Sequence, residues 1–240
     1  VKIFDVATGE EKFRYSDPTV KNGELTGLTL SADNSRISFS LKAASHPNYL
    51  HSVDRATKAV RWSMKNVMMS KATPDRTLLG VSIDNTIHIL REDSGERVCA
   101  MEPSRAFIWD IAFSPDSTLV AAGDHHGFAS VWNAASGERR QRFRVTNGRV
   151  NGAAFTRDGR LVTLAQLTAD ESSQRVIQVW NPDNLVAVET HFATAAYTYA
   201  LSINPENGTI CAPGRVTKFW RTPVHEQVVA FRELLQNILS

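Results

Sequence analysis

The residues with the most obvious chemical potential lie together at Asp124-His125-His126-Gly127. Imidazoles titrate near neutral pH and bind transition metals, so a ligand pair or a proton shuttle is one interpretation. Neighbouring residues of a tight turn seldom point at the same ion, and Gly127 suits a positive φ. We favour a polar hairpin turn, and we expect no metal site and no cofactor.

A second polar group is basic and follows this turn. Alternation along an extended strand would place Arg140, Arg142 and Arg144 on one face. They could contact a phosphate or an acidic peptide, or their charges could keep an exposed edge strand from pairing with another sheet. We favour the second interpretation, and both stay open. No aromatic ladder accompanies these arginines, so a nucleic-acid partner is not expected.

Local motifs of the common enzyme classes are missing. The sequence has no GxGxxG or GxxxxGK phosphate loop, no GxSxG elbow, no HExxH helix and no EF-hand loop. Cys99 and Cys211 lack the spacing of metal ligands and are expected to be buried, reduced thiols. We therefore assign no catalytic residue. A site assembled from distant segments would leave no such motif, so an enzyme stays the alternative.

The composition is that of an ordinary globular protein. Of 240 residues 42% are hydrophobic, and 27 Lys and Arg against 25 Asp and Glu leave a net charge of +2. This balance creates no field that attracts nucleic acid or an anionic membrane. No apolar run approaches the roughly 20 residues that cross a bilayer. The start has neither a secretory signal nor an initiating Met, so we expect a cytoplasmic, intracellular protein and part of a longer chain.

The elements that position these residues are predicted by a repeat of about forty residues. An apolar, polar, acid pattern recurs at intervals of 41 to 48 residues, with its acids at Asp33, Asp75, Asp116, Asp158 and Glu206. A second pattern, alternating apolar residues that end in a large residue, recurs at 1–5, 50–54, 87–91, 129–133, 177–181 and 217–221. Turn residues follow its first five copies, so each unit is predicted to hold four short strands.

Four short antiparallel strands at this spacing resemble the WD40 repeat. The similarity is strongest over 113–138, which contains Phe-Ser-Pro-Asp and Val-Trp-Asn-Ala-Ala-Ser-Gly-Glu, whereas the family's Gly-His before the first strand is missing from every unit. The resemblance implies an all-β propeller of four-stranded antiparallel blades. Five complete blades are expected at about 24–63, 66–101, 106–144, 149–191 and 198–221. Residues 1–15 form a half blade, whose inner strands are expected upstream of Val1.

The periodicity changes after Trp220. Apolar residues at Val224, Val228, Phe231 and Leu235 follow helical spacing, which predicts an amphipathic C-terminal helix within 222–240. An alternative keeps the blade register, with an outermost strand over 226–231 and a helix only over 232–239. Both alternatives stay open.

The resemblance also implies where a partner would bind. In WD40 propellers the loops between second and third strands lie on one rim of the axial channel, and the long polar connections 41–48 and 167–175 favour this rim. The position four residues before the end of each first strand often faces the rim. This position is occupied by Thr26, Met68, Trp109, Asn151 and Tyr199, which we expect to contact a partner. Arg105 and His125 are two further expected contact residues.

Trp109 is the first choice among them, because tryptophan is enriched at interface hot spots. The alternative is that these side chains fill the core between blades. We expect a non-catalytic scaffold or recognition module that binds a protein or peptide on the channel rim. A metal-dependent hydrolase with a site at the channel, and a purely structural domain of a larger protein, are the alternatives, because one propeller architecture hosts many functions.

Overall fold

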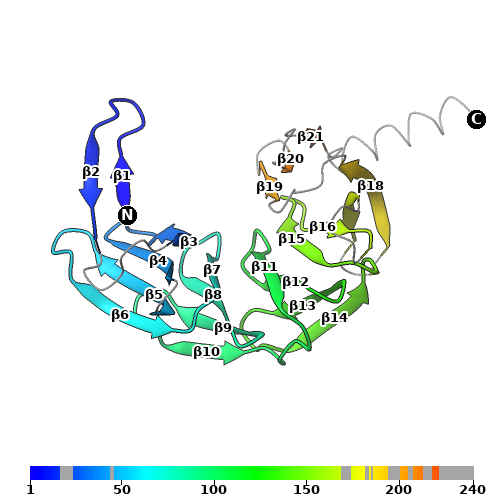
Figure 1. Cartoon of the computed structure of the whole chain (residues 1–240), viewed down its shortest axis with the longest axis horizontal. Coiled ribbons are helices and arrows are strands. Elements are labelled where there is room, and N and C mark those ends of the chain that lie inside the picture. Colours follow the sequence, from blue (N-terminus) through cyan, green and yellow to red (C-terminus); the bar gives the residue numbers. More distant parts are fainter. Residues whose placement is uncertain are drawn as a thin grey trace, which may run out of the picture. The chain divides into compact units, whose positions relative to one another are not determined.

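The computed structural model describes residues 1–16, 24–43, 46–168, 174–181, 184, 186–193, 201–204, 208–212 and 218–221. Every helix or strand assigned within these residues is a β-strand (Figure 1), and none of this part is a helix that could span a membrane. The chain divides into two compact units, Val1–Met101 and Glu102–Ser240, each with sheets of its own.

The first unit holds three antiparallel sheets. The first sheet pairs β1 (Lys2–Phe4) with β2 (Glu11–Arg14). The second has four strands in chain order, β3 (Glu24–Leu30), β4 (Arg36–Ala43), β5 (His46–Asp54) and β6 (Val60–Lys65). The third contains β7 (Met69–Ala72), β8 (Leu78–Ile83), β9 (Thr86–Arg91) and β10 (Arg97–Ala100).

The second unit repeats this arrangement. One sheet contains β11 (Ile108–Phe113), β12 (Leu119–Asp124), β13 (Phe128–Asn133) and β14 (Arg139–Arg144). The next contains β15 (Val150–Phe155), β16 (Leu161–Gln166), β17 (Arg175–Trp180) and β18 (Ala187–Ala193). The last contains β19 (Ser202–Ile203), β20 (Thr209–Ala212) and β21 (Lys218–Arg221).

The predicted all-β class and the four-stranded antiparallel sheets are confirmed. The sheet of β19 to β21 shows three strands in the part of the chain that the structure describes. Its expected outer strand, 226–231, and the C-terminal helix within 222–240 lie outside that part. The prediction of a long loop over 41–48 was wrong, because β4 and β5 continue through it and Ala43 pairs with His46. Polar residues on an exposed hairpin are compatible with strand pairing.

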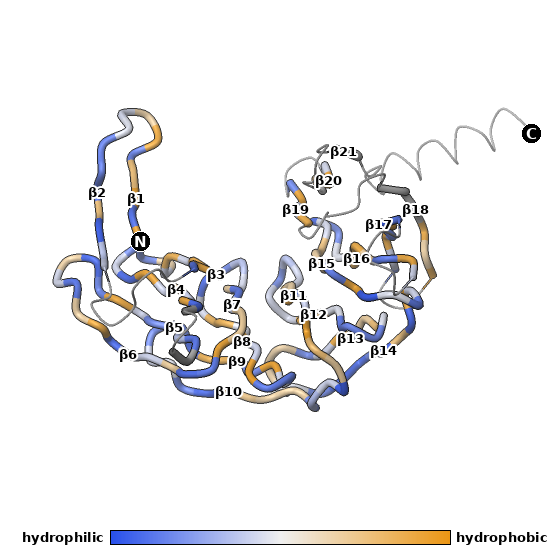
Figure 2. Tube along the Cα trace, in the orientation of Figure 1, coloured by the Kyte–Doolittle hydropathy of each residue, from blue (hydrophilic) through white to orange (hydrophobic). Residues whose placement is uncertain are grey.

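The two four-stranded sheets of each unit pack against each other through the first and second strands of one sheet and the first strand of the next. In the first unit β3 and β4 contact β7, and in the second unit β11 and β12 contact β15. The core of the first unit draws on both sheets, with Leu50 from one and Leu79, Val81 and Leu90 from the other. Figure 2 shows hydrophilic and hydrophobic residues interspersed along the strands, as expected when side chains alternate between faces.

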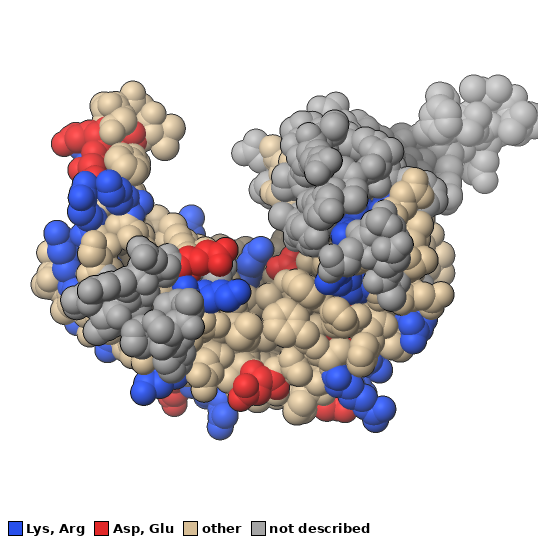
Figure 3. All heavy atoms as spheres, in the orientation of Figure 1, with Lys and Arg blue, Asp and Glu red and all other residues tan. Residues whose placement is uncertain are grey.

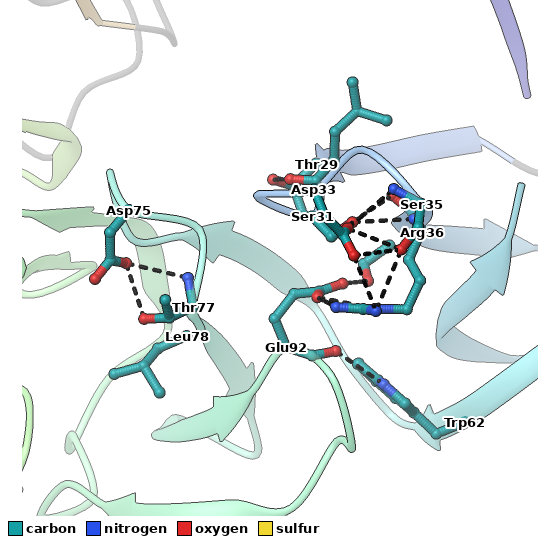
Figure 4. Close-up of polar contacts among 12 residues, drawn as sticks. Thr29, Ser31, Asp33, Ser35, Arg36, Trp62, Asp75, Thr77, Leu78 and Glu92 are labelled. Carbon is teal, nitrogen blue, oxygen red and sulfur yellow. Dashed lines mark hydrogen bonds and ion pairs between the residues drawn. The ribbon is translucent and has the colours of Figure 1, made fainter.

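The recurring acid of the sequence pattern builds the turn between the first two strands of the sheets that begin with β3, β7 and β11. Asp33 Oδ1 accepts hydrogen bonds from the Ser31 hydroxyl (2.6 Å) and the Ser35 backbone N–H (3.0 Å). Asp75 and Asp116 are held in the same way, and Figure 4 shows the turns of Asp33 and Asp75. These bonds satisfy the turn's polar groups locally, which explains why an acid recurs.

Acid should destabilise these turns. Hydrogen bonds from Ser31 and Ser35 lower the pKa of Asp33, and those from Ser114 and Thr118 lower the pKa of Asp116. Because the folded values lie below the unfolded value, the stabilisation is fully present above about pH 4 and is lost as pH falls through the folded pKa. We expect the melting temperature, followed by circular dichroism, to fall as pH drops from about 4 to 2. The double variant Asp33→Asn/Asp116→Asn should show a shallower fall, and an equal slope would contradict this role.

A buried carboxylate links the two four-stranded sheets of the first unit. Glu92 follows β9 and is 2% exposed. Its Oε2 lies 2.8 Å from Arg36 Nη2, and its Oε1 accepts from the Ser38 hydroxyl at 3.1 Å, both on β4 (Figure 4). Its backbone carbonyl accepts from Trp62 Nε1 at 3.0 Å. The hydrogen bond between Glu92 and Arg36 is the main cause that raises the pKa of the Arg36 guanidinium. Strands β4 and β6 are thus tied to the chain after β9.

Two tryptophans of the second unit occupy similar places but differ in their partners. Trp180 pairs in register with Leu161, and its Nε1 donates to the Thr163 hydroxyl at 2.9 Å. Trp132 pairs in register with Val120, which places Ala122 where the other sheet has Thr163. Within the described residues the buried Nε1 of Trp132 has no hydrogen-bond acceptor.

A hydroxyl at position 122 should therefore stabilise the protein. Ala122→Ser supplies an acceptor to Trp132, and a net gain of about 1 kcal/mol is expected for one added hydrogen bond. Thr163→Ala should do the reverse and cost about 1–3 kcal/mol, because it leaves Trp180 Nε1 buried and unpaired. Urea unfolding of both variants measures these changes. Destabilisation by Ala122→Ser would show that the site has no room for the hydroxyl.

Candidate functional site

Three of the expected rim positions occupy β-bulges. The register between the first and second strands shifts at Thr26 in β3, at Trp109 in β11 and at Asn151 in β15. A bulge inserts one residue into the strand and re-aims its side chain. Counting residues along the repeat therefore locates one recurring structural position. Tyr199 lies outside the described residues.

Trp109 is half-buried within a cluster of rings. Its Nε1 donates to His125 Nδ1 at 3.3 Å, and the two rings are stacked with centroids 6.0 Å apart. The ring of Phe107 packs on the indole in a T-shaped arrangement, with an interplanar angle of 71° and centroids 5.1 Å apart. The guanidinium carbon of Arg149 lies 5.1 Å from the centroid of the indole, within range of a cation–π interaction. We call Phe107, Trp109, His125 and Arg149 the Trp109 surface.

The turn after β12 holds His125 in place. Asp124 is buried, and its Oδ1 accepts from the backbone N–H of His126 at 2.9 Å and of Phe128 at 3.0 Å. Gly127 has a φ of +82°, and a Cβ there would lie 2.2 Å from the Thr146 carbonyl oxygen. The Asp-His-His-Gly motif thus forms a hairpin turn. The described residues contain no group of three or more His, Cys, Asp or Glu placed to hold a metal.

Two of the three predicted arginines converge on one ring. The guanidinium carbons of Arg142 and Arg144 lie 3.9 and 4.4 Å from the centroid of Phe128. Arg142 Nη2 is 3.5 Å from Asp124 Oδ2. Arg144 Nη1 donates to the carbonyl oxygens of His126 (3.4 Å) and Thr146 (3.2 Å). We call Phe128, Arg142 and Arg144 the Phe128 surface.

Arg140 does not continue this pattern. The pairing of β13 with β14 shifts between Val131 and Trp132, so that Arg139 is opposite Trp132 and Arg140 has no partner in the register. The expected alternation of Arg140 with Arg142 and Arg144 is therefore broken by a bulge. Arg139 instead forms an ion pair with Glu102 at 2.8 Å.

The remaining candidates differ in exposure. Asn151 is only 3% exposed, so the expectation that it faces a partner disagrees with its burial; neither amide atom has a hydrogen-bond partner among the described residues. Met68 is 36% exposed and lies next to the start of β7, with its sulfur 3.4 Å from Asn48 Nδ2. Arg105 is exposed. Thr26 lies in β3.

The first unit contains a hollow between β3 and β7. It has a volume of about 430 Å³ and is lined by residues that include Gly27, Ser70 and Lys71. Ser70 and Ser40 hydroxyls lie 2.6 Å apart beside Gly27, where a Cβ would come within 2.6 Å of Ser70 Oγ. Glycine is thus required for the close approach of the two strands.

Charges of both signs are interspersed on the face drawn in Figure 3, in agreement with the small net charge. At the Trp109 surface and the Phe128 surface, positive side chains outnumber negative ones. Arg142, Arg144 and Arg149 lie against their rings, and Asp124 is the one carboxylate within 4 Å of a guanidinium nitrogen of Arg142 or Arg144 among the described residues.

Sequence reasoning missed Phe107, Phe128 and Arg149. Phe107 and Phe128 are single aromatic residues without a repeat partner that would mark them. Arg149 reaches Trp109 from the position just before β15, a contact that depends on how two sheets pack. The one available sequence signal was proximity, since Phe107 lies two residues before Trp109 and Phe128 directly follows the turn that begins at Asp124.

Comparison with known proteins agrees with this architecture. Residues 95–133 match the family described as "WD domain, G-beta repeat". A chain in a crystal structure of the mitotic checkpoint complex superposes with a TM-score of 0.73 at 17% identity, covering 92% of this chain and 67% of that one. No match to a curated protein was found.

Two further solved structures share the fold. The RRP9 WD40 repeats align with a TM-score of 0.56 at 23% identity, and U3-55K aligns with 0.57 at 21% identity. Each alignment covers 66% of this chain, which spans about half of the other chain, 48% and 49% respectively. The fold is that of WD40 β-propellers, and the resemblance read from the repeat is confirmed.

Proposed function

We propose that this chain is a non-catalytic scaffold or recognition module that binds a protein or peptide through the Trp109 surface. The observation that carries the proposal is the placement of Trp109. It lies at a bulge, half-buried, with His125, Phe107 and Arg149 fixing its ring. Bulges of this kind are often found beside functional sites.

A tryptophan held in this way suits recognition. Its large ring offers much contact area, and its neighbours already restrict its rotamers, so little side-chain entropy remains to be lost on binding. Tryptophan and arginine are also the residue types that dominate hot spots. The Trp109 surface combines both with two further rings.

The structural comparisons support the same class of function. One similar chain comes from a structure of the mitotic checkpoint complex, and a WD40 fold in an assembly of that kind is consistent with a role in holding proteins together. By analogy of fold alone, we extend this role to the present chain.

The proposal is tested by affinity capture with the intact chain and with a Trp109→Ala chain in parallel. Proteins recovered by the first and lost from the second support it. Recovery of the same proteins at the same yield by both chains would overturn it.

A further inference from the structure

We infer that the Phe128 surface binds an anionic side chain, a carboxylate or a phosphorylated hydroxyl, in a peptide segment of the partner. The inference rests on the proposed function, because it assigns a chemical class to the segment that lies next to the Trp109 surface. The two surfaces are joined by the Asp124 turn, since His125 stacks on Trp109 and Phe128 follows Gly127 directly.

The geometry of Arg144 prepares it for an anion. Its Nη1 donates to the two carbonyl oxygens of His126 and Thr146, and its guanidinium lies against the ring of Phe128. These contacts fix the plane of the guanidinium and leave Nε and Nη2 without a hydrogen-bond acceptor among the described residues. A fixed guanidinium edge with free N–H groups is the arrangement that binds carboxylate or phosphate through two parallel hydrogen bonds.

The charge of the site is not balanced within the protein. Arg142 and Arg144 share one aromatic ring, and Asp124 is the one carboxylate paired with either of them among the described residues. That carboxylate also accepts the two N–H bonds that build the turn, and its distance to Arg142 Nη2 is a long 3.5 Å. Two cations held close together repel each other, so an incoming anion would relieve this repulsion.

A peptide fits the site better than a nucleic acid does. Base stacking needs aromatic faces that are open to solvent. Two guanidinium groups lie over the ring of Phe128, so this ring offers little open face on which a base could stack. The N–H groups of Arg144 that have no acceptor among the described residues are charged donors, and such donors favour an anionic ligand.

The test measures binding of fluorescent peptides to the chain of residues 1–240 by anisotropy. The probes are a glutamate-rich peptide, a phosphoserine peptide of the same length and a glutamine-rich control. We expect one or both anionic probes to bind, the glutamine control not to bind, and added salt to weaken binding. Arg144→Ala should weaken it about tenfold or more, as for loss of a charge-assisted pair. Arg142→Ala should weaken it by a smaller factor, because this arginine already has Asp124.

Arg140→Ala is the matched control, because this arginine lies on the same strand without a contact to Phe128, and its binding should equal that of the unaltered chain. Failure of both anionic probes to bind would overturn the inference, as would equal losses in Arg140→Ala and Arg144→Ala. Binding of a single-stranded RNA that depends on Arg144, with no binding of either peptide, would also overturn it. Capture that is lost in Trp109→Ala while peptides do not bind would leave the proposed function standing and the anionic site refuted.

Discussion

Trp109→Ala is expected to abolish recovery of the partner while the protein stays folded. The indole makes ring contacts with Phe107 and His125 and is only partly buried, so it is available to a partner and is not required to fill a closed core. Truncating a central hot-spot tryptophan typically costs about 2–4 kcal/mol of binding free energy, a weakening of about thirtyfold or more. Affinity capture followed by titration of the recovered partner measures this loss.

The matched control is another exposed aromatic residue. Phe4→Ala removes a ring that is 51% exposed on β1 in the first unit, and it should leave capture unchanged. Thermal unfolding of both variants separates binding from folding. Should Trp109→Ala lower the melting temperature strongly, the tryptophan belongs to the core and the surface assigned to it is wrong.

Among the substitutions considered, Glu92→Ala is expected to lower the free energy of unfolding most. Removing the carboxylate leaves Nε and Nη2 of Arg36 and the Ser38 hydroxyl without their acceptor and breaks the link between the two sheets. Breaking a buried ion pair typically costs about 3–5 kcal/mol. Because 21% of the Arg36 side chain stays exposed, we expect a value near 3 kcal/mol. Urea unfolding of the chain of residues 1–240, with and without the substitution, gives this value.

Two variants sharpen this result. Glu92→Gln keeps an oxygen that can accept a hydrogen bond but loses the charge, so its loss of stability should be intermediate. Glu96→Ala removes an exposed carboxylate from the same connection between β9 and β10 and should change stability by less than about 0.5 kcal/mol. A change equally small in Glu92→Ala would contradict the role of the buried carboxylate.

The features that sequence reasoning located are those whose contacts are local. Asp33, Asp75 and Asp116 each accept a hydrogen bond from a hydroxyl two residues earlier in the chain. A short recurring sequence pattern is therefore enough to predict the role of these acids in the turns. The bulge position of Trp109 recurs at a fixed distance from the end of a strand, and counting was enough to find it.

The missed features depend on contacts between distant segments. Glu92 and Arg36 are 56 residues apart, and neither belongs to a repeated motif. Arg140 was grouped with Arg142 and Arg144 by strict alternation, which a bulge interrupts because one extra residue shifts the register of β14. Asn151 shares the bulge position of Trp109 but is buried, because packing between sheets sets exposure and residue counting does not.

Hydrogen–deuterium exchange of the chain, alone and with its captured partner, tests most directly whether recognition takes place at the Trp109 surface. Slower exchange is predicted in 105–109, in the turn at 124–128 and in 142–149. Unchanged exchange in all three segments, with protection confined to residues 1–16 and 24–43 of the first unit, would contradict the account.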